Sequence, residues 1–305
     1  NTIENKGLLI ESENLITAYY EVLGTNKYGT VNTDIFTLKG SNSLGKEFYT
    51  PFQTTFDNYS YGTSPDAWSS IDIVATEDNT VITVTPTTVI YATPENITAN
   101  TPITIILNRG QTYSVRNASQ LAKNSLSGSY VLSDKPIAVT IKDDSVLDKS
   151  GSSYDLIGDQ LIPVRMLGTQ YITGGAYLYI IPTENNSEIK ITYSNNKNGI
   201  STIDTILDAG NTLALLDLAD KPLNNSFRIT TSLPCYIFAV KKLEREYGGA
   251  VIPTITCTGS RSISVANTAD ETLMFEIVTK TENANNFTVN GKPFNFGNSD
   301  LTSEY

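Results

Sequence analysis

The amino-acid sequence predicts an all-β protein built from a repeat of four-stranded antiparallel units, arranged like the blades of a β-propeller. Three observations predict this fold class. A short apolar strand, a polar turn and a second strand recur six times, about every 50 residues. A turn glycine followed three residues later by a large apolar residue recurs between these pairs. Helical periodicity is nearly absent, whereas Tyr, Thr, Ile, Val and Asn fill the strand and turn segments.

Each recurring pair is expected to form a β-hairpin, because two short apolar runs flank a cluster of polar turn residues. In chain order the pairs are 8–12 with 15–18, 71–74 with 81–84, 130–132 with 137–139, 178–181 with 189–191, 227–229 with 236–238, and 275–278 with 287–289. The turn glycines that open the second half of a unit are Gly45, Gly110, Gly168 and Gly210, while the pattern has drifted at Gly259. Segment 204–218 is interpreted as a hairpin around Gly210, since glycine inside a helix costs about 1 kcal/mol.

The units could close radially as propeller blades or stack as tandem β-sandwich modules. Alternate units match better than adjacent ones: the Thr-Glu-Asp-Asn turn at 76–79 resembles the turns at 183–186 and 281–283. The chain therefore also repeats about every 100 residues. Tandem sandwiches would explain the 100-residue period without the 50-residue period. The 50-residue period therefore favours propeller blades, and tandem β-sandwich modules are the alternative. Radial closure would also protect the edges of short sheets.

The repeat predicts one β domain over residues 1–305, with approximate units 1–69, 70–127, 128–175, 176–225, 226–270 and 271–305. The last unit is incomplete, which favours a fragment of a longer protein. Apolar runs at 103–107, 131–132 and 180–181 are expected to lie between sheets, buried on both faces.

Composition excludes several classes of function. The net charge of −11 and the lack of a Lys/Arg run argue against nucleic-acid binding. The sequence contains no run of about 18 apolar residues, so no membrane-spanning helix is expected. The chain has no histidine, no phosphate-binding G-x-x-x-x-G-K-[ST] loop and no C-x-x-C pair, so histidine-based catalysis and nucleotide, zinc or redox cofactors are not expected.

The two cysteines, Cys235 and Cys257, are candidates for a cross-strand disulfide. A turn centred near Glu246 would place residues whose numbers add to 492 opposite each other, as 235 and 257 do. The alternative is that both are small buried apolar residues.

The motifs around residues 128–171 carry a family resemblance. Segment 128–139 reads GSYVLSDKPIAV, followed by Asp155, by DQLIPV at 159–164 and by LGTQY at 167–171. The opening KGLLIES at 6–12 and the EDNT turn at 77–80 look like further pieces of the same family. Together they resemble the N-terminal domain of the IgGFc-binding protein family, with Leu167 where that family has tryptophan. The family's cysteines in the loop before the Gln-Leu-x-Pro segment are missing here.

The resemblance implies a non-catalytic recognition or adhesion module of a larger exported or cell-surface protein. Animal members are secreted with mucus and bacterial members are exported or surface-anchored, and the Asn, Lys, Ile and Thr usage favours a bacterial member. The implied partner is a protein or glycan, such as a mucin or an antibody, bound through loops between strands, beside neighbouring modules of the same chain. The alternative to a recognition module is a purely structural spacer, which would bind no partner.

Acidic residues suggest two further hypotheses. A carbohydrate-active hydrolase on a propeller would use paired carboxylates, with candidates in the loop 142–155 and at Asp204, Asp208 and Asp217. The same loop has oxygen ligands for Ca²⁺ but lacks the alternation that would fix the geometry. The candidate calcium ligands are Asp143, Asp144, Asp148 and Asp155. A solvated polar loop is the plain alternative.

Aromatic residues gather in an insertion of the first unit, between residues 51 and 70. They include Phe56, Tyr59, Tyr61 and Trp68, the single tryptophan, set among Gly, Ser and Pro. Flat rings on such a loop are typical of binding surfaces, because they give contact area at small entropy cost. The alternative is that they fold back and cap the unit's own core. A second insertion, 87–102, with Tyr91 as its single aromatic residue, is expected to be a long hairpin.

Overall fold

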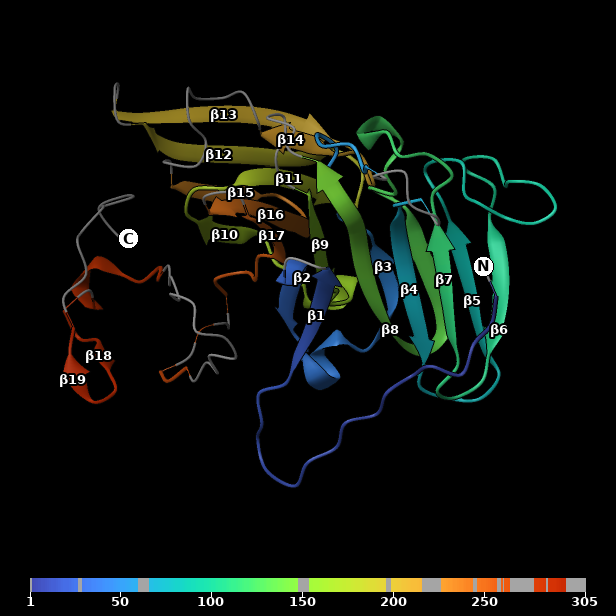
Figure 1. The fold of residues 1–305 in the computed structure, drawn as a ribbon. Helices are drawn as coiled ribbons and strands as arrows, with labels where there is room; N and C mark the ends of the chain where they lie inside the picture. The colour runs from blue at the N-terminus through green and yellow to red at the C-terminus, as the bar shows by residue number, and fades with distance from the viewer. Residues whose placement is uncertain are drawn as a thin grey trace.

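The regular secondary structure of the described residues is almost entirely antiparallel β-sheet (Figure 1). The structure is a computed structural model that describes residues 2–26, 29–59, 66–147, 154–195, 199–215, 226–243, 246–256, 259, 261–263, 277–283 and 285–294. Within these ranges the helical segments are short 3-10 helices: Gly40–Ser43, Ala122–Asn124, Val164–Met166 and Thr281–Asn283. The all-β prediction is confirmed. None of the described helices has the length and hydropathy of a membrane span.

The first lobe comprises β3 to β9, which form one curved, nearly closed sheet of seven strands. Its strands are β3 (Gly45–Tyr49), β4 (Ser69–Ala75), β5 (Thr80–Thr85), β6 (Ile103–Leu107), β7 (Thr112–Arg116), β8 (Tyr130–Leu147) and β9 (Tyr154–Gln160). The long β8 takes part in both halves of the sheet. Its first residues, 130–133, lie between β3 and β5, and residues 137–147 pair with β4 on one side and β9 on the other.

The second lobe comprises β10 to β17, which form two sheets of four strands. Its strands are β10 (Gln170–Thr173), β11 (Tyr177–Pro182), β12 (Ser187–Asn195), β13 (Gly199–Leu207), β14 (Leu213–Leu215), β15 (Phe227–Thr231), β16 (Cys235–Leu243) and β17 (Glu246–Val251). The orders are β10-β15-β12-β13 and β14-β11-β16-β17. One apolar core, with residues from both sheets, lies between them, so this lobe is a β-sandwich.

Strand order in the second lobe repeats that of the first, with β15 and β16 taking the places of the two halves of β8. Val131 pairs with Phe48 and Val84, and Ile229 pairs in the same way with Tyr171 and Ile191. The turns agree in detail as well. Asn79 and Asn186 both have positive φ, 52° and 57°, and Thr80 Oγ1 and Ser187 Oγ donate to the carbonyl three residues back, at 2.8 and 2.9 Å.

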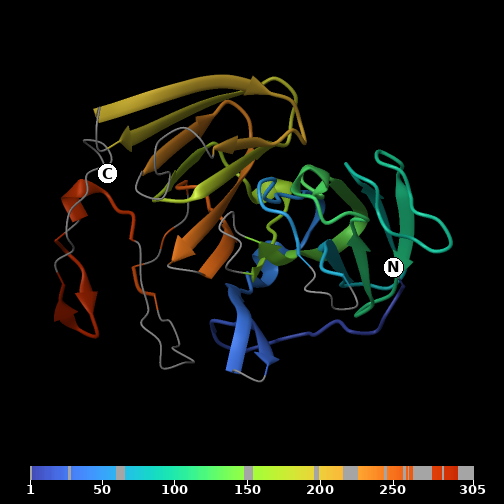
Figure 2. The same ribbon diagram turned by 45° about the horizontal axis from the view of Figure 1, so that its top comes forward.

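The middle sheet of the molecule, β14-β11-β16-β17, is covered on both faces (Figure 2). Leu178 and Ile180 face the core of the second lobe, whereas Tyr179 and Ile181 pack into the core of the first. All four are 0% exposed. The expectation of two-sided burial is confirmed here, but Ile106 and Leu132 are 57% and 45% exposed, so it is wrong for the first lobe's outer strands.

Two hairpins flank the lobes. The strands β1 (Tyr19–Asn26) and β2 (Gly29–Thr37) pair with each other, and β2 packs beside β9. Near the other end β18 (Thr288–Val289) pairs with β19 (Lys292–Pro293). In Figure 1 these pairs lie beneath the lobes and at the far left, respectively.

Most of the expected hairpins, and the propeller built from them, are not found among the described strands. A blade joins strands that are consecutive in sequence, whereas β4 and β5 pair with different halves of β8, and β11 and β12 belong to different sheets. Segments 130–132 and 137–139 are parts of the single strand β8. Strands β13 and β14, on either side of Gly210, also lie in different sheets. The pairings recur at the longer period, in two facing layers.

Candidate functional site

The aromatic residues of the insertion between β3 and β4 differ in burial. Phe56 is 3% exposed, and its ring lies 5.3 Å from that of Tyr177 and 5.4 Å from that of Tyr247. It caps the core, as in the alternative interpretation. Tyr59 is 42% exposed and its ring centre lies 5.3 Å from that of Tyr154. Tyr61 lies outside the described residues.

Trp68 forms a surface stack with two residues that the sequence did not single out as a site. The guanidinium carbon of Arg116 lies 4.4 Å from the ring centre of Trp68 and 3.8 Å from that of Tyr91. We call these three residues the Arg116 stack. Antiparallel pairing of Ser70 with Arg116 brings the start of β4 beside the end of β7. A cation beside an aromatic face is stabilised by the ring quadrupole, by about 0.5 to 1 kcal/mol at exposed sites.

Backbone hydrogen bonds hold the loop that carries Tyr91. Tyr91 N donates to Arg116 O at 3.0 Å, and Ile90 and Ile97 exchange two backbone hydrogen bonds of 3.0 Å. Ile90 is 0% exposed, so the loop is anchored in the core one residue before the ring. Val89 on this loop and Leu121 in the segment after β7 are 40% and 45% exposed and add apolar area to the surface. The stack is therefore placed on a fixed backbone, which limits the entropy lost on binding.

The buried side chain of Asp143 holds the aromatic insertion in place through hydrogen bonds. Its carboxylate is 2% exposed and accepts hydrogen bonds from Gln53 Nε2 at 2.6 Å, Asn58 Nδ2 at 2.6 Å and Ser69 Oγ at 2.8 Å. Gln53 in turn accepts from the backbone N–H of Phe56 at 2.7 Å. Burial raises the pKa of Asp143, and these donors oppose that shift. Asp143 thus acts in the fold of the loop.

The other acidic candidates do not converge on one point. Asp155 Oδ2 accepts from the backbone N–H of Tyr247 at 3.1 Å, and the exposed Asp144 follows the buried Asp143 on the opposite face of β8. Within the described ranges no three Asp, Glu or Cys residues are grouped as metal ligands. Asp148 and Asp217 lie outside those ranges. Among the described residues the calcium candidates are therefore not grouped around one point, and the paired carboxylates of a hydrolase stay a prediction.

Cys235 is buried at the start of β16, and burial raises the pKa of its thiol to about 12. The predicted register was wrong: β16 pairs Leu243 with Glu246, so opposite residues have numbers that add to 489 and not 492. Cys257 lies outside the described residues, and the disulfide stays a prediction.

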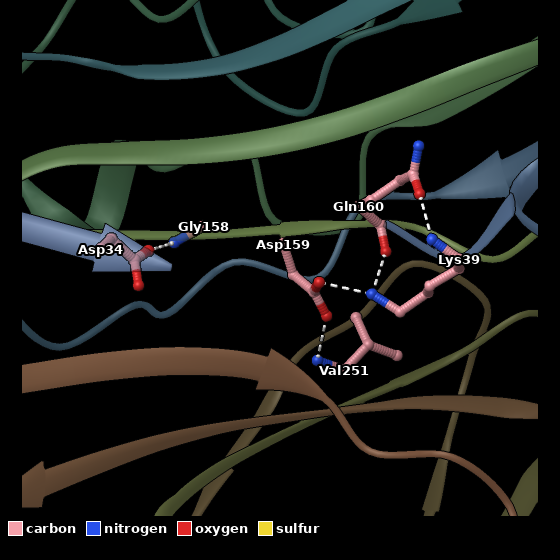
Figure 3. A network of polar contacts seen from close by, with 6 residues as sticks. All are labelled: Asp34, Lys39, Gly158, Asp159, Gln160 and Val251. Carbon is pink, nitrogen blue, oxygen red and sulfur yellow. Dashed lines mark hydrogen bonds and ion pairs between the residues drawn. The ribbon is translucent and has the colours of Figure 1, made fainter. Parts of the chain in front are cut away.

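A polar seam joins β2, β9 and β17, three strands from different parts of the chain (Figure 3). Asp34 Oδ2 accepts from Gly158 N at 3.0 Å, and Asp159 Oδ2 accepts from Val251 N at 2.8 Å. Lys39 forms an ion pair with Asp159, and its backbone N–H donates to Gln160 Oε1 at 2.6 Å. Each aspartate therefore satisfies a backbone donor of the neighbouring strand, and the seam fixes how the lobes and β2 meet.

We expect the seam to weaken as pH rises from about 4 to about 7. Burial raises the pKa of Asp34 to about 7, and burial together with Glu246 raises that of Asp155 to about 7. In the unfolded chain both pKa values fall near 4, so the folded state binds more protons in this window and unfolding becomes easier as pH increases. The loss should be about 1 to 2 kcal/mol per carboxyl, after allowance for solvent screening.

Thermal unfolding of the native chain and of Asp34→Asn at constant ionic strength measures this effect. The amide retains an acceptor for Gly158 N–H but carries no titrating charge. The variant should therefore lose less stability than the native chain between pH 5 and pH 8. Equal losses in the two proteins would show that Asp34 does not contribute.

A shallow groove of about 590 Å³ lies on the outer face of the second lobe. Its lining comes from β12, β13 and β15, with Lys190 and Asp204 paired across the strands. Ile206 is 61% exposed there. This is the second surface that could take a ligand, and it lacks the aromatic residues of the Arg116 stack.

Comparison with known protein families decides the relationship of the chain. A family model described as IgGFc binding protein matches residues 34–304. The chain belongs to the IgGFc-binding protein family. This confirms the resemblance seen in the sequence, and the match covers both lobes. Searches of curated proteins and of solved structures gave no match.

In this member of the IgGFc-binding family, sequence reasoning found Trp68 and missed its partners. Tyr91 was assigned to a simple hairpin, and β5 and β6 do form that hairpin. Arg116 gave no local signal, because its role depends on the pairing of β4 with β7. The single aromatic residue of the polar insertion 87–102, Tyr91, was the one local signal that could have indicated a partner for Trp68.

Proposed function

We propose that this chain is a non-catalytic recognition module of an exported or cell-surface protein, which binds a protein or glycan partner through the Arg116 stack. Membership of a family of binding domains supports the general class. The single observation that carries the choice of surface is the guanidinium of Arg116 held 4.4 Å from the Trp68 ring and 3.8 Å from the Tyr91 ring.

The chemistry of the stack suits recognition. Trp, Tyr and Arg are the residue types that most often dominate binding energy at interfaces, because they combine large apolar area with hydrogen-bonding groups. Contact with two rings restrains the guanidinium of Arg116, so less side-chain entropy is lost when a partner binds. Aromatic rings can also stack on the apolar faces of sugar rings, so glycans are among the proposed partners.

The test measures binding of immobilised antibody Fc fragment and of purified mucin to the chain, by biolayer interferometry. We expect at least one probe to bind, and Trp68→Ala to weaken that binding at least about tenfold, the loss of roughly 1.4 kcal/mol or more that a central aromatic contact gives. Tyr20→Ala is the matched control, because Tyr20 is 48% exposed on β1, outside both lobes.

Two outcomes would go against the proposal. Binding that survives Trp68→Ala, with the fold intact by circular dichroism, would move the site away from the stack. Failure of both probes to bind would favour the structural spacer. The hydrolase has weaker support, because Asp143, its best-placed carboxylate in the described loop, already accepts three hydrogen bonds.

A further inference from the structure

Strand β13 (Gly199–Leu207) forms a long open edge of the second lobe, at its upper border in Figure 1. It is the last strand in the order β10-β15-β12-β13, and among the strands that the structure describes it pairs with β12 alone. Its nine residues make it the longest edge strand of either lobe, and β6, at the equivalent edge of the first lobe, has five. The backbone N–H and C=O groups on its outer side are therefore placed to bond a further strand.

Strand β13 lacks most of the features that protect a sheet edge from pairing. Natural edges are often short, bulged, or occupied by proline and lysine. The nine pairs that β13 makes with β12 run without a bulge, and its sequence contains neither proline nor lysine. Its single charged residue is Asp204, and Ile200 and Ile206 are 63% and 61% exposed. The edge is thus both long and suited to pairing.

The sequence of β13 is close to a palindrome, which makes the strand complementary to a second copy of itself. It reads GISTIDTIL, with isoleucines and hydroxyl residues at equal distances on either side of Ile203. Two antiparallel copies centred on Ile203 place opposite each other residues whose numbers add to 406. The pairs are Gly199 with Leu207, Ile200 with Ile206, Ser201 with Thr205, Thr202 with Asp204, and Ile203 with its own copy.

This register also keeps the two faces of the sheet continuous. Ile203 and Leu207 pack against the core of the second lobe, whereas Ile200 and Ile206 are exposed. Successive side chains of a strand point to opposite faces, so the odd-numbered residues of β13 face the core and the even-numbered ones face solvent. Because the register places even-numbered residues opposite even-numbered ones, the cores of the two copies lie on the same side of the joined sheet.

The side chains that this register brings together suit each other chemically. On the solvent face Ile200 of one copy contacts Ile206 of the other, and two-fold symmetry makes this contact twice. The hydroxyl of Thr202 can donate to the carboxylate of Asp204 in the other copy. Lys190 lies opposite Asp204 on β12, and its positive charge offsets repulsion between the two copies of Asp204 near the axis.

We propose that β13 pairs with β13 of a second copy of this chain, in the antiparallel register centred on Ile203. Two sheets of four strands then continue as one sheet across a two-fold axis. A single pair of strands buries little area, so the dimer is weak and forms at micromolar concentrations or above. The proposal is independent of the recognition function, since β13 belongs to the second lobe and the Arg116 stack to the first.

Sedimentation velocity of the full chain from about 1 to about 200 µM measures this association over the affinity range of weak interfaces. Salt at about 0.15 M screens the repulsion between chains of net charge −11. The average mass should rise from that of one chain toward that of two and no further, because a two-fold contact is closed.

Charges placed on the solvent face of β13 should weaken the dimer. Ile200→Lys and Ile206→Glu should each reduce association at least about tenfold, because each places a charge opposite an apolar side chain. Both positions are exposed in the single chain, so its fold should remain. Ile106→Lys is the matched control: Ile106 is 57% exposed and occupies the equivalent position of the edge strand β6. It should associate like the native chain.

Mixing variants tests the register. When Ile200→Lys is mixed with Ile206→Glu, the introduced lysine faces the introduced glutamate, so the mixture should associate more strongly than either variant alone. Ile200→Lys mixed with Ile200→Glu is the control, because six residues of strand, about 20 Å, separate these two positions in the proposed pairing. This second mixture should show no such recovery.

Three results would overturn the proposal. The first is a native chain that stays monomeric at the highest concentration, and the second is a loss of association in Ile106→Lys equal to that in Ile206→Glu. The third is a mixture of Ile200→Lys with Ile206→Glu that associates no better than the control mixture.

Discussion

Replacement of Asp143 by alanine is expected to lower the free energy of unfolding by about 3 to 5 kcal/mol. The carboxylate is the common acceptor for donors on Gln53, Asn58 and Ser69, each of which is 6% exposed or less. Truncation leaves these buried donors without their acceptor and opens a space in the core. The insertion that begins after β3 should then detach from β8.

Asp144→Ala is the matched control for this effect. Asp144 is the next residue on β8, carries the same group and is exposed. Its removal should change stability by less than about 0.5 kcal/mol, as most surface substitutions do. Denaturant unfolding of both variants gives the comparison. Similar losses would show that Asp143 does not organise the loop.

A second large effect is expected for Gly128→Ala, which should cost about 3 kcal/mol or more. Gly128 has φ of +76°, and a Cβ there would lie 1.8 Å from the carbonyl oxygen of Gly210. Positive φ alone costs an L-residue about 1 to 2 kcal/mol. The remainder comes from the backbone of the second lobe, which must move away to relieve the clash.

Gly199→Ala separates the two contributions. Gly199 has φ of +80°, and no described heavy atom lies within 4 Å of the Cβ position. This variant should lose about 1 kcal/mol, through backbone conformation alone. If thermal unfolding gave equal losses for the two variants, the close approach of the lobes at Gly128 would be contradicted.

The sequence predicted strands better than it predicted their partners. Local patterns are enough for a strand: the fully apolar run at Leu178–Ile181 correctly indicates burial on both faces, and the turns at Asn79 and Asn186 recur as expected. The choice of partner depends on contacts far apart in the chain. Thus β4 and β5, separated by one short turn, pair with β8 at opposite ends.

Proline misled the interpretation of β8. Pro136, between the segments 130–132 and 137–139 that were expected to form a hairpin, has no backbone N–H for the ladder and so favours a break between two strands. In the structure it lies between the two halves of one 18-residue strand, at the point where the pairing partners change from β3 and β5 to β4 and β9. In the second lobe the equivalent Pro234 does separate β15 from β16.

The candidate site could be predicted only in part, because local composition is visible in the sequence whereas contacts between distant segments are not. Trp68 and Tyr59 were expected at the surface from the composition of their loop, and Tyr59 is 42% exposed. Phe56 was expected beside them but is 3% exposed, because its ring packs against Tyr177 and Tyr247 of the second lobe. Arg116 could be found only when the pairing of β4 with β7 was known.

Hydrogen exchange of the chain with and without its bound probe tests the proposed recognition surface most directly. If the Arg116 stack is the binding face, protection should gather in peptides that cover residues 66–70, 87–92 and 112–118. Protection confined to β12, β13 and β15, around the groove at Lys190 and Asp204, would contradict this account and assign recognition to the second lobe.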